Sequence, residues 1–309
     1  MPRRDTMRPH NTVREDERSL TGRPGTDHSP IRQIDLHTFG IAPRPFLRTM
    51  AASFDDLPWD HYDVKSAQVD LLRRRFPDET DRLTRFLRDY YAGRSELETV
   101  SDLLRRLPVE DRRALEGIRP HRRRCLANFA VAYDPAGAPR VERTPIGSFA
   151  QQVGPDDCRT LPRVFAEAPV EVTTQPIFRR LLEGVTALAN EVAAPRRAGR
   201  LVFHQVRTMA RPGTPGQAAP EGIHQDGSDY IVSALVIERK AVLGGESTIY
   251  GPDRQTVYLR TVLQPGEGLF HADSGSPLWH GVSPVRLDPA SGRSEGKRSI
   301  IGFDIHLEK

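Results

Sequence analysis

Residues 230–251, YIVSALVIERKAVLGGESTIYG, place two apolar, β-branched runs on either side of a glycine-rich turn. Such runs, bounded by glycine, are typical of β-strands joined by tight connections. About seven of them follow one another over the last hundred residues, with a Gly or Pro cluster at nearly every joint. The others are RLVFHQVRTMA (200–210), TVYLRTV (256–262), GLFHA (268–272), LWHGVSPVRL (278–287) and RSIIGFDIHL (298–307). This rhythm predicts a sandwich or jelly-roll barrel and not a βαβ sheet.

Upstream segments have helical spacing instead. In DETDRLTRFLRDYYAGR (78–94), Leu83, Phe86, Leu87 and Tyr90 recur at three and four residues and would share one helix face. Two flanking segments read in the same way, KSAQVDLLRRRF (65–76) and SELETVSDLLRRL (95–107). The stretch from about 64 to 118 therefore looks like a helical insertion.

After residue 121 the chain returns to short β-rich pieces, followed by one more amphipathic helix. The pieces are CLANFAVAY (125–133), PRVERTPI (139–146) and LPRVFAEA (161–168), and the helix is QPIFRRLLEGVTALANEVAA (175–194). We predict three parts, listed in chain order: a polar, flexible tail in residues 1–43, an N-terminal helical region with an insertion in 44–120, and a β domain in 121–309. The fold class is mainly β with helices (α+β).

Charge and composition exclude several classes of function. The net charge of +4 is the balance of 45 basic and 41 acidic residues, and the basic runs at 73–75 and 122–124 lack the interleaved aromatics of a nucleic-acid platform. We interpret both runs as solvated faces or local ion pairs, with no nucleic-acid partner. Two cysteines are too few for a disulfide framework, and no apolar run approaches the roughly 18 residues of a membrane helix. A cytoplasmic protein without a membrane partner is the prediction; the sequence leaves the oligomeric state open.

The segment PEGIHQDGSDYI (220–231) carries the candidate chemistry. His224 and Asp226 stand two positions apart at the predicted edge of a strand, so both would project from one face. His280, in a later predicted strand, supplies a third donor. Two histidines and one carboxylate leave three metal positions open, as in non-haem Fe(II) oxygenases; zinc with an activated water is the chemical alternative. His271 and Asp273 repeat the spacing but lack a well-placed histidine partner.

These residues resemble a known family. The run PEGIHQDGSDYI, then GGESTIY (244–250), HGVSPV (280–285) and a late arginine, is similar to the bacterial L-isoleucine hydroxylase type of 2-oxoglutarate and Fe(II) dioxygenase. The likeness covers about 45–62 and 121–309 and is strongest from 201 onwards. It implies a double-stranded β-helix (jelly-roll, cupin-like) core with N-terminal helical segments. It also implies that iron binds His224, Asp226 and His280, the catalytic residues, and that Arg298 binds the cosubstrate 2-oxoglutarate, with Arg286 as the substitute.

The resemblance further implies hydroxylation of an aliphatic C–H of a free L-amino acid or a close derivative by O₂, with release of succinate and CO₂. Four residues are candidates for substrate binding: Gln205 and Arg207 on one strand face for a carboxylate, Glu246 for an ammonium group, and Tyr230 as a pocket wall. One alternative is the same chemistry on a carrier-bound or peptidyl amino acid, with the helical insertion docking a carrier protein. Another is a metal-binding barrel protein without oxygenase activity.

Overall fold

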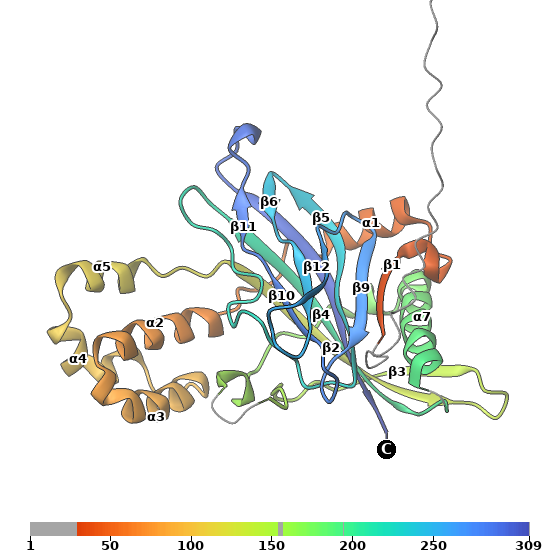
Figure 1. The fold of residues 1–309 in the computed structure, drawn as a ribbon, viewed down its shortest axis with the longest axis horizontal. Coiled ribbons are helices and arrows are strands. Elements are labelled where there is room, and N and C mark those ends of the chain that lie inside the picture. Colours follow the sequence, from red (N-terminus) through yellow and green to blue (C-terminus); the bar gives the residue numbers. More distant parts are fainter. Residues whose placement is uncertain (1–29, 154–156, 194, 309) are drawn as a thin grey trace, which may run out of the picture.

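A seven-stranded antiparallel sheet forms the centre of the molecule (Figure 1). The computed structural model describes residues 30–153, 157–193 and 195–308. The strand order in the large sheet is β1-β9-β5-β12-β4-β2-β3, and two smaller sheets have the orders β10-β7-β8 and β11-β6. The strands are β1 (Ile31–Asp35), β2 (Arg122–Tyr133), β3 (Pro139–Thr144), β4 (Gly199–Ala210), β5 (Tyr230–Lys240), β6 (Val242–Gly244), β7 (Ser247–Tyr250), β8 (Val257–Thr261), β9 (Glu267–Ala272), β10 (Trp279–Val282), β11 (Val285–Leu287) and β12 (Gly296–Leu307).

The central strand β12 shows why this sequence makes a two-sided sheet. It pairs with β4 and β5 along its length, and successive side chains point to opposite faces. Ile301, Phe303 and Ile305 enter an apolar core on one face. Arg298 and Ile300 point to the other face, where a cavity lies. The alternation in this strand therefore separates the core from the site.

Helices cover the apolar face of the large sheet. The helices α1 (Pro43–Ala52) and α7 (Pro176–Ala193) bury their apolar sides in this core. Phe178 of α7 lies 5.0 Å from Phe203 and 6.3 Å from Phe129, measured between ring centroids. On the opposite face, β5 and β9 pack against the three-stranded sheet β10-β7-β8 through a second apolar cluster, which includes Ala234, Ile249, Leu269 and Leu278.

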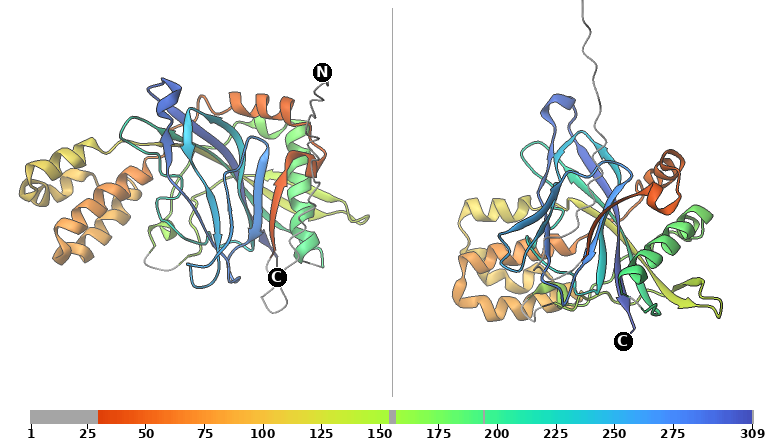
Figure 2. Two further views of the ribbon diagram at one scale, coloured as in Figure 1. Left: turned by 45° about the horizontal axis from the view of Figure 1, so that its top comes forward. Right: turned by 45° about the vertical axis from the view of Figure 1, so that its right-hand side comes forward.

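A separate helical unit projects from the side of the sheets, away from α1 and α7 (Figure 2). It has its own apolar core, which includes Val69, Leu72, Leu83, Phe86 and Leu103. The helices are α2 (Tyr62–Arg75), α3 (Thr80–Tyr91), α4 (Ser101–Arg106) and α5 (Val109–Gly117). The remaining short elements, in this unit and in the rest of the chain, are α6 (Val170–Thr173) and the 3-10 turns η1 (Leu36–Phe39), η2 (Pro77–Glu79), η3 (Leu97–Val100), η4 (Cys158–Thr160) and η5 (Pro289–Ser291).

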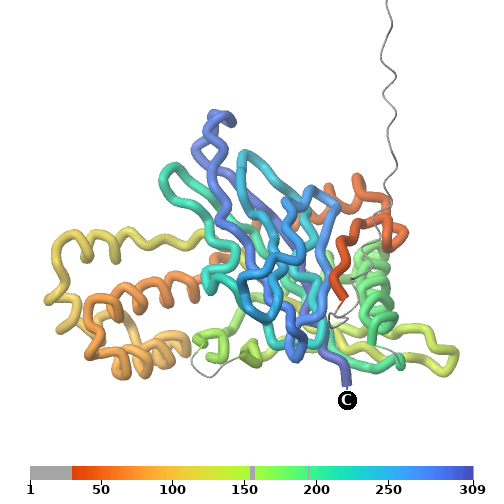
Figure 3. The backbone as a smooth tube through the Cα atoms, viewed as in Figure 1, coloured from red at the N-terminus to blue at the C-terminus, as the bar shows by residue number. Residues whose placement is uncertain are grey.

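Two expectations about local structure are wrong. Residues 161–168 make only isolated bridges, Phe149 with Arg163 and Leu126 with Glu167, and form no strand. Residues 31–43, assigned to the tail, are ordered, and β1 pairs with β9 (Figure 3). Ile34 of β1 is buried. The β1 run is too short to carry a sequence period, and its pairing with β9 and the burial of Ile34 are tertiary contacts that no local pattern indicates. Residues 1–29 of the predicted tail lie outside the described residues.

None of the helices in the described part of the chain combines the length and apolar composition that a bilayer crossing requires.

Truncating Phe178 tests the packing of α7 on the sheet. Its side chain is 1% exposed, so Phe178→Ala should lower the free energy of unfolding by about 3–5 kcal/mol, through lost burial and a residual cavity. Urea unfolding followed by circular dichroism measures this. The matched control is Arg179→Ala on the exposed side of the same helix, expected to cost less than about 1 kcal/mol. Equal losses for the two variants would contradict this packing.

Candidate metal centre and its cavity

A backbone bridge brings the two predicted histidine ligands together. His224 lies in the loop before β5, and His280 lies in β10. The amide of His224 donates to the carbonyl of His280 at 2.8 Å, and the amide of His280 donates back at 3.0 Å. This antiparallel pair places the two imidazole rings on the same side, with centroids 4.1 Å apart.

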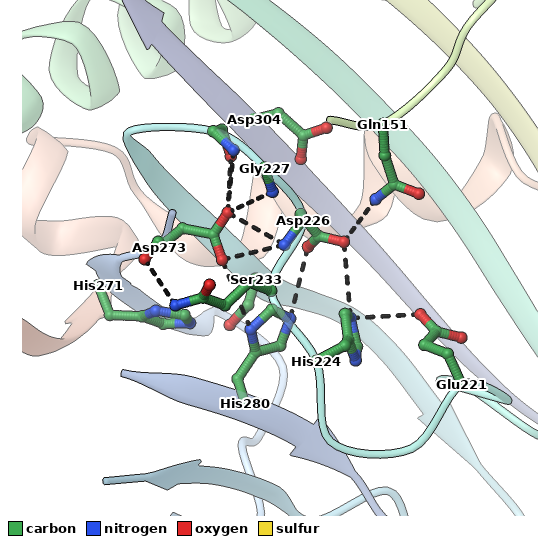
Figure 4. Close-up of polar contacts among 12 residues, drawn as sticks. Gln151, Glu221, His224, Asp226, Gly227, Ser233, His271, Asp273, His280 and Asp304 are labelled. Carbon is green, nitrogen blue, oxygen red and sulfur yellow. Dashed lines mark hydrogen bonds and ion pairs between the residues drawn. The ribbon is translucent and has the colours of Figure 1, made fainter. Parts of the chain in front are cut away.

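The carboxylate of Asp226 completes the group. Its Oδ1 lies 3.5 Å from His224 Nε2, and its Oδ2 lies 3.4 Å from His280 Nε2 (Figure 4). One ligand atom from each of the three residues lies within 4.8 Å of the others. The Nδ1 of His224 lies 2.9 Å from the carbonyl of Gly222, so a proton on Nδ1 leaves Nε2 free as a donor to a cation. The donor set and its convergence fit a divalent first-row metal.

The electrostatics of the group favour a bound positive charge. Burial alone would raise the pKa of Asp226, but the charges and hydrogen bonds of His224 and His280 outweigh burial and hold that pKa well below its usual value. Burial likewise opposes protonation of His224, yet Asp226 raises the pKa of His224 to about 9. Gln151 Nε2 donates to Asp226 Oδ1 at 2.5 Å, and Arg159 Nη1 lies 3.4 Å from the same oxygen. The Asp226 carboxylate is therefore ionised and fixed in orientation.

A buried aspartate holds the turn that carries Asp226. Asp273 is 0% exposed and accepts backbone hydrogen bonds from Asp226, Gly227 and Ser228 at 2.8–3.0 Å. Gly227 has φ +89°, and a Cβ there would lie 2.5 Å from the carbonyl oxygen of Gln152, so only glycine fits the turn. His271, the other half of this second HxD pair, is buried, and burial lowers its pKa to about 3. The His271–Asp273 pair thus stabilises the turn that carries Asp226. Among the described residues it belongs to no second group of possible metal ligands.

The three residues face a cavity of about 440 Å³ between the sheets and the helical unit. Arg298 lies in its wall and is 2% exposed, and its Nε and Nη2 have no hydrogen-bond partner among the described residues. Burial lowers the pKa of Arg298 to about 10. Gly245 lies against it, since a Cβ there would approach the Arg298 Cδ to 2.8 Å. The helix α2 supplies another wall through one polar face, made of Tyr62, Asp63, Ser66, Ala67, Asp70 and Arg74.

The structure places the predicted substrate residues outside the cavity wall. Gln205 bonds Ser53 on the α1 side of the sheet, and Arg207 pairs with Asp55 at 2.8 Å and approaches Glu238 at 3.5 Å. These two residues share a face of β4, as predicted, but it is the face turned away from the metal group. None of the four candidates is among the described residues that line the cavity.

The other two candidates also have partners elsewhere. Tyr230 stacks on Phe270 with ring centroids 5.7 Å apart. Glu246 is partly exposed and pairs with Arg260 at 3.4 Å. Both side chains are therefore accounted for by packing or by a surface ion pair.

Several cavity residues were missed by sequence reasoning. The run at 122–124 was interpreted as a solvated face or local ion pairs. Arg122 does pair with Asp60 and Asp63, but Arg122 and Arg124 both line the cavity. The available signal was the alternation along β2, which puts 122 and 124 on one face. Gln151, Arg163 and Glu221 come from irregular segments and Arg159 from the three-residue turn η4, where no periodicity indicates direction.

Comparison with known proteins identifies the family. A family model described as 2OG-Fe dioxygenase matches residues 103–304, which is most of the chain. The chain belongs to the 2OG-Fe dioxygenase family. It is therefore an oxidoreductase, and its cofactors are Fe(II) and the cosubstrate 2-oxoglutarate. A search of curated proteins gives no match.

Three solved structures are similar to this dioxygenase. A bsmA homologue from Methylobium petroleophilum PM1 has a TM-score of 0.59 at 15% identity, covering 90% of this chain and 88% of that one. IDO from Bacillus thuringiensis has a TM-score of 0.49 at 16% identity, with 61% and 79% covered. The Fe(II)/(alpha)ketoglutarate-dependent dioxygenase TqaL has a TM-score of 0.45 at 18% identity, with 80% and 91% covered.

Removing the Asp273 carboxylate should loosen the metal site without touching a ligand atom. Asp273→Ala releases the turn that positions Asp226, and we expect Fe(II) affinity to fall about 10- to 100-fold, as for other groups that orient ligands. Anaerobic titration with Fe(II) measures it, and Asp273→Asn, which keeps one acceptor oxygen, should recover part of the loss. The matched control is Asp253→Ala, because Asp253 caps an exposed turn in the same way. Unchanged affinity in Asp273→Ala would refute the positioning role.

Proposed function

We propose that the protein hydroxylates an aliphatic C–H bond of a free L-amino acid or a close derivative. In this reaction one oxygen atom of O₂ enters the substrate as a hydroxyl group and the other enters succinate, while 2-oxoglutarate loses CO₂. The observation that carries the proposal is the convergence of His224, Asp226 and His280 on one cavity that also contains the unpartnered Arg298.

His224, Asp226 and His280 are the proposed iron ligands. Bound Fe(II) would activate O₂ with 2-oxoglutarate and so supply the oxidising power for C–H cleavage. The protein's own contribution is positional. The His224–His280 bridge fixes two donors, Gln151 and Arg159 fix the carboxylate, and the walls limit access of water to the reacting centre.

Arg298 is the proposed partner of the 2-oxoglutarate carboxylate. A guanidinium offers a planar fork of donors that matches a carboxylate, and two of its nitrogens are unpartnered here. Arg286, the substitute considered from the sequence, is exposed in β11 and is not among the described residues of the cavity wall. Burial and the cavity thus favour Arg298 for this task.

The chemistry of the cavity supports an amino acid as substrate. Glu221 Oε1 lies 3.2 Å from His224 Nε2, so a carboxylate stands beside the metal group where it could accept from an ammonium. Buried arginines line other parts of the wall, which suits a zwitterion. The L-isoleucine hydroxylase type remains part of this proposal.

The facing antiparallel sheets support a double-stranded β-helix over 121–309. The helical unit is then the insertion of the 44–120 region. Carrier docking by that unit stays a prediction.

Anaerobic addition of Fe(II) and 2-oxoglutarate tests the proposed function. The intact protein should develop a weak visible charge-transfer band, because the cosubstrate chelates iron held by the three ligands. His280→Ala and Asp226→Ala should lose the band, and the control His37→Ala, at an exposed position, should keep it. A protein that binds only zinc would show no band with the intact chain, and that result would reject the oxygenase.

Arg298 can be tested separately. Arg298→Gln removes the charge and the fork, so the KM for 2-oxoglutarate should rise by about 10- to 100-fold, the loss typical of a charged hydrogen bond. Succinate formation at varied 2-oxoglutarate gives this KM. The control is Arg286→Gln, which should leave the KM unchanged. If Arg286→Gln raised the KM and Arg298→Gln did not, the two roles would be exchanged.

A further inference from the structure

The buried and half-buried arginines of the cavity wall fall into two groups. Arg122 and Arg159 have acidic partners: Asp60 lies 3.2 Å from Arg122, and Asp157 lies 2.8 Å from Arg159. Arg124, Arg163 and Arg298 have no carboxylate within 4.0 Å among the described residues. Burying a guanidinium without a counter-ion is unfavourable, so these three positions leave anion sites open in the cavity.

Arg124 and Arg163 lie together on an aromatic platform made of Phe149 and Phe165. The Cζ of Arg124 lies 4.6 Å from the ring centroid of Phe165 and 5.6 Å from that of Phe149. The Cζ of Arg163 lies 5.6 Å and 5.3 Å from the same two centroids. Aromatic faces stabilise the cations but do not neutralise them. The platform therefore holds two like charges side by side with no acid between them.

Hydrogen bonds fix the direction of both guanidinium groups. Arg124 Nη2 donates to His204 Nδ1 at 2.7 Å, and His204 Nε2 lies 2.9 Å from Asp304 Oδ2. Because a guanidinium only donates hydrogen bonds, His204 Nδ1 is the acceptor of the Arg124 bond. This bond orients Arg124 but does not neutralise its charge.

Arg163 is held from the side of the metal group. It is 6% exposed, and its Nη2 donates to Gln151 Oε1 at 2.9 Å. The amide nitrogen of the same Gln151 donates to Asp226. One glutamine side chain thus separates Arg163 from the metal group. The Nε atoms of Arg124 and Arg163 have no hydrogen-bond partner in the part of the chain that the structure describes.

We propose that Arg124 and Arg163 form a second anion site, which binds the carboxylate of the substrate. This inference rests on the proposed function, in which iron and Arg298 take the two ends of 2-oxoglutarate. The Arg124–Arg163 pair then remains for an anionic group of the other reactant. Because the pair lies beside Gln151, it would hold a substrate carboxylate at a fixed distance from the metal. The pair would thereby select which substrate carbon faces the metal.

The test compares L-amino acids with their carboxamides. A panel of the common L-amino acids and the corresponding L-amino acid amides is added to the enzyme with Fe(II), 2-oxoglutarate and O₂, and succinate is measured. At least one acid should stimulate succinate formation, and its uncharged amide should do so about 10- to 100-fold less efficiently in kcat/KM. Arg124→Gln and Arg163→Gln should raise the KM for that acid by a similar factor but not the KM for 2-oxoglutarate.

Controls separate this inference from the function on which it rests. Arg124→Lys and Arg163→Lys retain the charge without the fork and should give smaller increases, and Arg211→Gln, whose side chain pairs with Glu295 outside the cavity, should give none. Folding of each variant is checked by the anaerobic charge-transfer band. Equal stimulation by acids and amides would overturn the second site, as would stimulation by no acid while the band is present. Absence of the band in the intact protein would instead reject the proposed function.

Discussion

The backbone pairing of His224 with His280 is the constraint on which the rest of the site depends. It ties a loop to a strand 56 residues further along the chain, and it sets the separation of two imidazoles through backbone geometry and not through side-chain packing. Gln225 strengthens the tie, because its amide nitrogen lies within 3.1 Å of three carbonyls in the β9–β10 connection. Asp273 then holds the next turn. These contacts hold Asp226 within 3.5 Å of both histidines.

Charged side chains are distributed unevenly around this centre, so different parts of the cavity suit ligands of different charge. The carboxylate of Asp226 and two imidazoles define a place for a cation. Arg298 in one wall and the Arg124–Arg163 pair in another are the proposed places for anions. The polar face of α2 forms one wall of the cavity, while the opposite face of the same helix packs into the helical unit. On these proposals a single cavity holds two anions and one cation.

Much of this could be predicted from the sequence, because strands joined by glycine turns carry a strong local pattern. The antiparallel β region and the amphipathic α7 follow from it. The meeting of His224, Asp226 and His280 was expected instead from the donor types and from the family resemblance. The predicted substrate role of Gln205 and Arg207 could not be settled from the pattern. The two residues share a face of β4, but the pattern alone does not say which face meets the cavity, and it is His204 that lies on the cavity side. Arg163 and Gln151 lie in irregular segments whose direction is set only by tertiary contacts.

The location of iron in the protein is the most direct test of this account. Crystals grown without oxygen in the presence of Fe(II) and 2-oxoglutarate, with diffraction recorded on both sides of the iron absorption edge, would reveal the metal by its anomalous signal. The account predicts one strong peak bonded to the Nε2 atoms of His224 and His280 and to the carboxylate of Asp226. A peak at other side chains, or none at these three in iron-loaded protein, would contradict it.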